Sequence, residues 1–161
     1  MKVGFGCDHR GFKTRESIMG LLIRLGHECV DFGTDMAEPP VDYTDIAYAA
    51  STAVARNEID RAILVCSTGM GMCIAANKVK GIRATFCMDE LSAEISRHHN
   101  HSNVLCLSAD QSGENHMHKI IEVWLNTQIG GGRHERRVRK ITEIEEGRDP
   151  REQNLNLTSS R

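Results

Sequence analysis

The stretch of sequence that decides the fold is residues 62–71, Ala62-Ile-Leu-Val-Cys66-Ser-Thr-Gly-Met-Gly71. Its first half is an unbroken apolar run, which is typical of a strand that is covered on both faces of a parallel sheet. The second half is a turn with two glycines, and a helical pattern follows it to about Lys78. A buried strand that turns directly into a helix predicts an α/β protein in which residues 62–66 form a central strand.

Short apolar runs alternate with longer helical patterns over most of the chain. Further strands are expected at residues 3–7, 29–32, 83–87 and 104–107. Helical patterns are expected at residues 12–25, 42–55, 70–78, 89–98 and 113–127. Because parallel strands are joined through helical crossovers, this alternation predicts a doubly wound parallel α/β sheet of five strands. Such sheets bind ligands beyond the carboxyl ends of their strands.

Length, composition and charge limit the class of protein. The chain has 161 residues, 40% of them hydrophobic, which suits one domain; we expect it over residues 1–148, with a polar and disordered tail at 149–161. The 20 Lys and Arg against 22 Asp and Glu give a net charge of −2, which argues against binding nucleic acid through bulk charge. No apolar run approaches the roughly 18 residues of a membrane span, and no signal-peptide pattern follows Met1, so we expect a cytoplasmic protein without membrane partners.

One of the six cysteines stands in a position suited to chemistry. The cysteines lack paired C-x-x-C spacing, which favours reduced thiols, most of them filling the core. Cys66 differs because it ends a strand at a turn that opens a helix, where the helix N-terminus favours a thiolate. Thr68 and the backbone N–H groups of this turn can hold an anion or a developing oxyanion. The alternative is that Cys66 simply ends a buried strand.

Histidines crowd the segment that precedes the last strand. His98, His99 and His101 lie within four residues, but neighbouring side chains on an irregular turn rarely converge, so we expect no metal site. One imidazole could instead transfer protons near neutral pH, or the segment could be a surface turn.

A basic segment follows the glycines at residues 130–132. Arg133 and Arg137 are four residues apart and therefore share a helix face, which suits binding of a phosphate. A solvated basic face is an equal alternative. A nucleic-acid surface fits less well, because the cluster is short and has no interleaved aromatic residues.

Taken together, these segments resemble the B-type ribose-5-phosphate isomerases and their relatives that isomerise galactose 6-phosphate and allose 6-phosphate. The motifs that carry the resemblance lie in the family's order between Lys2 and about Glu146. They are Gly6-Cys-Asp-His9 with Gly11, Asp42-Tyr43, Cys66-x-Thr-Gly-x-Gly71, Ile74-Ala-Ala-Asn-Lys78, Ser96-Arg-x-His-Asn100 and Gly131-Gly-Arg-His-x-x-Arg137. So many motifs in one order identify the chain as a member of this family.

The resemblance implies a Rossmann-like three-layer αβα sandwich with a five-stranded parallel sheet. It also implies an aldose–ketose isomerase that interconverts ribose 5-phosphate and ribulose 5-phosphate through a cis-enediol, with no metal and no other cofactor. The partners that it implies are a sugar phosphate and further copies of the chain, in a homodimer or homotetramer whose subunits share each active site.

The resemblance further implies a role for each matched residue. Cys66 is the base that moves a proton between C1 and C2, Thr68 stabilises the enediolate oxygen, and His99 opens the furanose ring. The residues implied in binding the substrate are Asp8 and Tyr43 near the sugar hydroxyls, Ser67, Gly69 and Gly71 at the oxyanion turn, and His9, Asn100, Arg133, His134 and Arg137 around the phosphate.

The chain departs from the family's pattern at two positions. Ser67 stands where the family usually has glycine, which adds a side chain beside the oxyanion turn. In the loop after the fifth strand the family often has an arginine that helps to bind phosphate, whereas this chain has Asp110. A carboxylate there would repel a phosphate unless the loop turns away or the substrate differs. One branch of the family uses a glutamate in the helix after the turn as base, but residues 70–73 hold no carboxylate, which favours the cysteine.

Three other functions are compatible with parts of the sequence. The substrate could be another phosphosugar, such as allose 6-phosphate or galactose 6-phosphate. A sugar-phosphate-binding subunit without activity is also conceivable, although such a protein would need neither Cys66 nor His99. The third is a nucleotide-binding module suggested by Gly4-x-Gly6, but His9 occupies the position of the third glycine of that fingerprint.

Overall fold

The computed structural model describes residues 1–151, and the last ten residues, where most of the predicted tail falls, lie outside the described part. The described part contains five strands and six α-helices. In chain order the elements are β1 (Lys2–Cys7), a 3-10 helix η1 (Phe12–Thr14), α1 (Arg15–Arg24), β2 (Glu28–Asp31), α2 (Tyr43–Ala55), β3 (Arg61–Cys66), α3 (Met70–Ala76), β4 (Ala84–Phe86), α4 (Glu90–Asn100), β5 (Val104–Ser108), α5 (Glu114–Asn126) and α6 (Arg133–Glu145).

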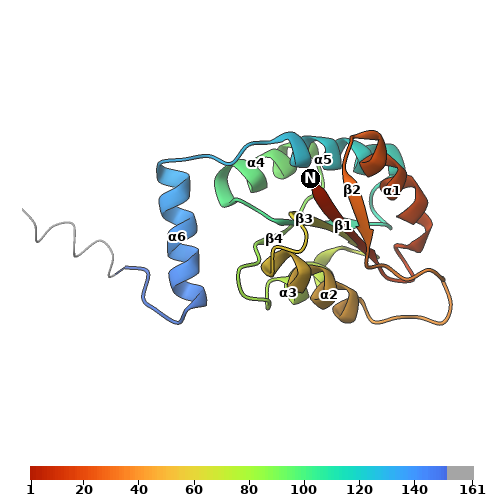
Figure 1. Cartoon of the computed structure of the whole chain (residues 1–161), viewed down its shortest axis with the longest axis horizontal. Coiled ribbons are helices and arrows are strands. Elements are labelled where there is room, and N and C mark those ends of the chain that lie inside the picture. The colour runs from red at the N-terminus through yellow and green to blue at the C-terminus, as the bar shows by residue number, and fades with distance from the viewer. Residues whose placement is uncertain (152–161) are drawn as a thin grey trace, which may run out of the picture.

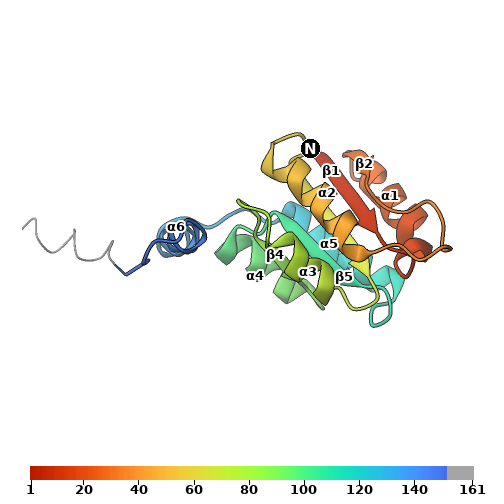
Figure 2. The ribbon, with the colours of Figure 1, turned by 90° about the horizontal axis from the view of Figure 1, so that it is seen from below.

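The five strands form one parallel sheet in the order β2-β1-β3-β5-β4. Helices α1, α4 and α5 cover one face, and α2 and α3 cover the other, so that the sheet lies between two helical layers (Figures 1 and 2). The predicted Rossmann-like αβα sandwich with five parallel strands is therefore confirmed. Each predicted strand is present, and no strand end differs by more than one residue from the prediction.

The central strand is β3, as the apolar run predicts. All residues from Ala62 to Cys66 are buried, because both faces of β3 pack against helices and both of its edges pair with strands. Val65 is in register with Cys7 of β1, and Cys66 with Ser108 of β5. This pairing on both sides fixes which way Cys66 points, since a slip by one residue would turn its side chain to the other face.

Helix α6 lies outside the two helical layers. It follows the extended segment after α5 and stands beside the end of α4, away from most of the sheet (Figures 1 and 2). Its contacts with the body include a hydrogen bond of 2.7 Å from the Gly81 N–H to Glu145 Oε1 and an ion pair between Lys80 and Glu146. None of the helices in the described residues combines the length and hydrophobicity that a bilayer span requires.

Candidate functional site

The turn after β3 brings the Cys66 thiol to the carboxyl end of the sheet. Cys66 is 4% exposed, and its Sγ accepts a hydrogen bond of 3.1 Å from the Gly69 N–H. Thr68 Oγ1 accepts a longer bond of 3.4 Å from the Met70 N–H at the start of α3. An N–H that points at sulfur stabilises a thiolate relative to a thiol. The turn therefore places a backbone N–H donor against the Cys66 sulfur.

Gly69 makes this turn possible because its backbone and its surroundings both exclude a side chain. Its φ is +74°, in the left-handed region, and a Cβ would lie 2.7 Å from the Phe86 ring and 2.9 Å from the Leu107 carbonyl oxygen. The Phe86 ring thus packs directly against the turn that holds the Cys66 sulfur.

We expect Gly69→Ala to destabilise the protein by about 1–3 kcal/mol, from the left-handed backbone and the clash with Phe86. Urea unfolding measures the change in the free energy of unfolding. Gly113→Ala is the matched control, since φ there is −71° and an added methyl group meets nothing within 4 Å. Equal stability of the two variants would show that the turn does not need glycine.

Tyr43 lies over the first turn of α3. A Cβ on Gly71 would lie 2.7 Å from two ring carbons of Tyr43, so the absence of a side chain at Gly71 lets the phenol approach the backbone. Tyr43 is the first residue of α2 and is 40% exposed. The structure therefore places the Tyr43 phenol beside the turn of Cys66, as expected for residues of one site.

Asp8 and His9 extend this group from the end of β1, the strand next to β3. The Asp8 side chain is buried, and its Oδ1 accepts bonds of 2.9 Å from the N–H groups of Arg10 and Gly11. One carboxylate oxygen of Asp8 thus fixes the loop after β1. His9 Nδ1 lies 3.3 Å from the Val41 carbonyl oxygen.

Eight of the residues expected in the site therefore share the carboxyl end of the sheet, and we call them the carboxyl-end group. They are Asp8, His9, Tyr43, Cys66, Ser67, Thr68, Gly69 and Gly71.

His99 and Asn100 lie at the opposite end of the sheet. Helix α4 runs back from the end of β4 to the start of β5, so its last residues reach the amino ends of the strands. Arg83, just before β4, fixes this position through its Nε, which donates to the carbonyl oxygens of Asn100 (3.1 Å) and His101 (3.2 Å). With a rise of about 3.3 Å per residue, strands of five or six residues separate the two ends by roughly 15–20 Å.

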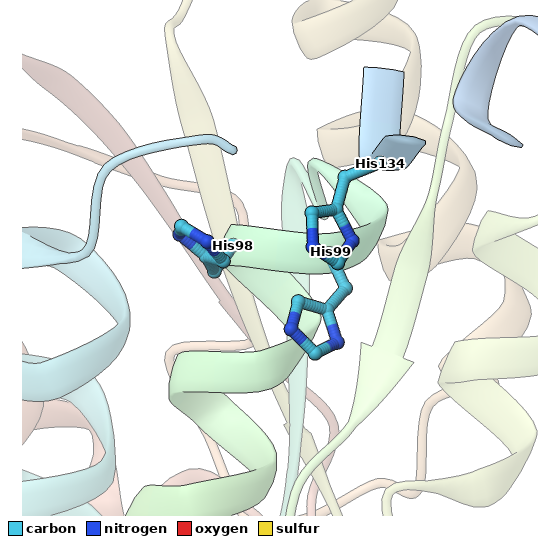
Figure 3. Close-up of side chains that lie close together, drawn as sticks. All are labelled: His98, His99 and His134. Atoms are coloured by element: carbon cyan, nitrogen blue, oxygen red, sulfur yellow. The ribbon is translucent and has the colours of Figure 1, made fainter. Parts of the chain in front are cut away.

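His134, at the start of α6, stacks on His99. The ring centroids are 4.1 Å apart and the planes differ by 10°, while His98 meets His134 edge-on at 5.4 Å (Figure 3). His134 is 8% exposed, and its buried Nδ1 has no hydrogen-bond partner among the described residues. Burial and then the neighbouring His99 lower the pKa of His134, which favours the neutral ring.

The three imidazoles of Figure 3 offer nitrogens within 4.8 Å of one another. Imidazole is a common zinc ligand, but its lone pairs lie in the ring plane. The stacked rings of His99 and His134 have nearly parallel planes, which do not meet close to either ring, so a metal bound by both would require one ring to rotate. His101, the third histidine of the segment that precedes the last strand, does not belong to this cluster. Its Nε2 lies 2.7 Å from the Gly130 carbonyl oxygen.

The remaining expected residues gather beside these histidines. Arg133 and Arg137 are exposed on α6, and Arg133 Nε lies 3.4 Å from His134 Nε2. The amino-end group, as we call it, consists of His99, Asn100, Arg133, His134 and Arg137. Within one chain the structure therefore divides the expected site into two groups at opposite ends of the sheet.

The other cysteines are mostly core residues, as expected, with one qualification. Cys7, Cys87 and Cys106 are buried, whereas Cys29 and Cys73 are half-buried. The pKa of Cys73 is lowered to about 7, chiefly by a hydrogen bond with the Cys106 side chain. Its sulfur also lies 3.4 Å from the carbonyl oxygen of Ala84, the first residue of β4.

The sequence reasoning also missed a pair of residues at the carboxyl end. Asp110, which stands in the loop where the family often has an arginine, forms an ion pair of 2.9 Å with Arg10. No local pattern could reveal this pair, because its members are 100 residues apart in the sequence.

The fold is an α/β protein whose Cys66 thiol and Thr68 hydroxyl lie at the carboxyl end of a parallel sheet, the end at which such sheets bind ligands. A thiol and a hydroxyl in this position suit proton transfer. The chain belongs to the ribose/galactose isomerase family, whose model matches residues 3–141.

Individual relatives agree with this family assignment. The chain is 44% identical to ribose-5-phosphate isomerase B of Escherichia coli over 92% of this chain and 99% of the relative. A solved structure of ribose-5-phosphate isomerase B from Clostridium thermocellum superposes with a TM-score of 0.89 at 44% identity, over 91% of this chain and 99% of that one. A D-erythrulose-4-phosphate isomerase of Pectobacterium atrosepticum is 36% identical over 88% of this chain and 93% of the relative.

Proposed function

We propose that this protein is a ribose-5-phosphate isomerase that interconverts D-ribose 5-phosphate and D-ribulose 5-phosphate through a cis-enediol. The observation that carries the proposal is the Cys66 thiol, buried at the end of the central strand with the Gly69 N–H 3.1 Å from its sulfur. The identity to the isomerases of E. coli and C. thermocellum over nearly their whole length supports this substrate. We assign the activity to one domain, residues 1–148, and to the cytoplasm.

In this proposal Cys66 removes the proton from C2 of the open-chain aldose and returns it to C1. The Gly69 N–H stabilises the thiolate before the transfer, since it already donates to the sulfur. Thr68 and the Gly71 N–H then stabilise the negative charge that develops on the enediolate oxygen, because N–H groups in the first turn of a helix have no carbonyl partner within it. Ser67 lies beside this turn.

The remaining residues of the carboxyl-end group bind the sugar hydroxyls and the phosphate, and the amino-end group contributes to the same site. Asp8 and Tyr43 bind sugar hydroxyls, and for Asp8 the second oxygen is suited to this, since Oδ1 holds the loop. His9 binds the phosphate, together with Arg133 and Arg137, while His134 and Asn100 lie nearby. His99 opens the furanose ring by proton transfer.

A site that uses both groups requires two copies of the chain. The groups lie at opposite ends of one sheet, about a strand length apart, so His99 of one copy would meet Cys66 of another. We therefore propose a homodimer, or a homotetramer built from such dimers, with active sites shared between copies. Large apolar side chains that are 40% to 64% exposed on α2, α3, α4 and α6 support such an interface: Tyr48, Ile74, Leu91, Ile141 and Ile144.

The test of the proposed function is an assay of ketose formation from a panel of aldose phosphates with the purified protein. The panel contains ribose 5-phosphate, allose 6-phosphate and galactose 6-phosphate, and D-erythrulose 4-phosphate, assayed for aldose formation, because a relative carries that name. We expect the highest kcat/KM with ribose 5-phosphate. Turnover of only the hexose phosphates or only the four-carbon sugar would reassign the substrate. Binding of sugar phosphates without any turnover would instead indicate a binding subunit.

A further inference from the structure

An ion pair bridges the carboxyl end of the sheet across the site of Cys66. Arg10, in the loop after β1, donates through Nη2 to both carboxylate oxygens of Asp110, at 3.1 and 2.9 Å. Asp110 lies in the loop after β5. Because β3 separates β1 from β5 in the sheet, the pair spans the end of the strand that carries Cys66.

Ser67 joins this pair to the turn after β3. Its side chain hydrogen-bonds the Asp110 carboxylate, and its carbonyl oxygen accepts the Asp110 N–H at 3.1 Å. Ser108 Oγ donates to the same carbonyl at 2.7 Å. Arg10 and then Ser67 hold the pKa of Asp110 below its ordinary value, so the carboxylate is charged and fixed in place. The two positions that depart from the family's pattern, Ser67 and Asp110, thus contact each other.

The ion pair borders a cavity of about 240 Å³. The residues that line it are His9, Arg10, Phe12, Lys13, Ala37 and Asp110. The only carboxylate among these six residues is already paired with a guanidinium, so the lining carries excess positive charge. A cavity of this size and charge suits a phosphate group.

Arg10 retains donors for such a ligand. Both of its bonds to Asp110 come from Nη2, and a guanidinium has further N–H groups on Nε and Nη1. Its side chain is 57% exposed, so these donors are within reach of a molecule in the cavity. His9 shares the cavity, and its Nδ1 lies against the Val41 carbonyl oxygen, which leaves Nε2 for the ligand.

We propose that Arg10, held in place by Asp110 and Ser67, binds the substrate's phosphate beside His9. The proposal rests on the proposed function, and it gives the two departures one physical meaning. Asp110 is not an isolated carboxylate beside the phosphate. It pairs with Arg10 of the loop after β1 and holds that guanidinium at the cavity. Arg10 is a binding residue in this arrangement, and Asp110 and Ser67 are positioning residues.

The experiment compares Arg10→Ala with the wild-type protein. A charge-assisted hydrogen bond to phosphate is worth about ten- to a hundredfold in affinity, so KM for ribose 5-phosphate should rise by that factor with kcat nearly unchanged. The inhibition constant of inorganic phosphate should rise by a similar factor. Arg56→Ala is the matched control, because Arg56 is also an exposed arginine in an ion pair, with Glu58 at the far end of α2; it should change neither constant.

Two further variants test the role of Asp110, so that the conclusion does not rest on Arg10→Ala alone. Asp110→Ala should raise KM less than Arg10→Ala does, because the guanidinium is then present but unrestrained. Asp110→Arg in the Arg10→Ala background should recover part of the lost affinity, since it returns a guanidinium to the cavity from the other loop. Arg10→Met, which keeps the aliphatic stem, replaces Arg10→Ala if that variant is unstable.

Several outcomes would overturn the proposal. Unchanged KM and unchanged phosphate inhibition in Arg10→Ala would remove Arg10 from the phosphate site, and a fall in kcat alone would give it another role. These outcomes leave the proposed function intact, provided that the wild-type protein turns over ribose 5-phosphate. If the wild-type protein turns over no sugar phosphate, the proposed function fails, and calorimetric binding of inorganic phosphate to the wild-type and Arg10→Ala proteins still decides the fate of Arg10.

Discussion

Cys66→Ala is expected to lower kcat by about a thousandfold, which is within the range that a positioned acid or base contributes. The physical reason is that the end of β3 and the Gly69 N–H hold the Cys66 thiol at the proposed site. The first turn of α3 has no acidic residue that could replace this thiol as the base. Binding of inorganic phosphate should survive, because the residues assigned to the phosphate lie elsewhere. Steady-state kinetics with ribose 5-phosphate and competition by phosphate measure the two effects separately.

Cys73→Ser is the matched control for this substitution. Cys73 has a pKa of about 7, so it is partly a thiolate at neutral pH and is the other cysteine that could act as a base. Its sulfur contacts the Ala84 carbonyl oxygen and Cys106, whereas the Cys66 sulfur accepts the Gly69 N–H of the turn after β3. The Cys73→Ser protein should therefore keep its activity. Full activity in Cys66→Ala, or loss of activity only in Cys73→Ser, would reject Cys66 as the base.

The second large effect is complementation between two inactive variants. Cys66→Ala and His99→Ala should each be nearly inactive with cyclic ribose 5-phosphate. In a heterodimer of the two, one site receives both intact groups and the other receives neither, so about half of the wild-type activity per dimer should return. Co-expression of two differently tagged chains, followed by purification through both tags, isolates this heterodimer for the assay.

The control for complementation uses two defects in the same group. A heterodimer of His99→Ala with Arg137→Ala has a damaged amino-end group in every site, so its activity should stay low. Failure of the Cys66→Ala and His99→Ala pair to recover any activity would mean that each chain holds its own complete site, contrary to the separation of the two groups along the sheet.

The fold could be predicted from the sequence because its signals are local. The apolar run at residues 62–66 identifies a buried central strand, and the alternation of strands and helices identifies a parallel sheet. The order β2-β1-β3-β5-β4 could not be derived in the same way, since hydrophobic periodicity carries no information on which strands pair. Helix α6 was indicated by the basic segment after residue 132, but not its place beside α4.

The site was predictable where its residues share one turn and not where they come from distant elements. Cys66 and Thr68 are neighbours in sequence and in space. The position of His99 at the amino end follows from the direction of the crossover helix between two parallel strands, which the alternation of strands and helices already indicates. The stack of His99 on His134 and the pair of Arg10 with Asp110 join segments that only the folded chain brings together.

The carboxyl-end group and the amino-end group also differ in how much of the protein must unfold before their residues leave their positions. Cys66 ends a strand that is paired on both sides, and opening a core strand costs a free energy close to that of global unfolding. Helix α6 lies outside the two helical layers and holds to the body through contacts such as the Gly81–Glu145 hydrogen bond and the His99–His134 stack. A local opening that costs far less free energy than unfolding can therefore release the arginines of α6 while the thiol stays in place.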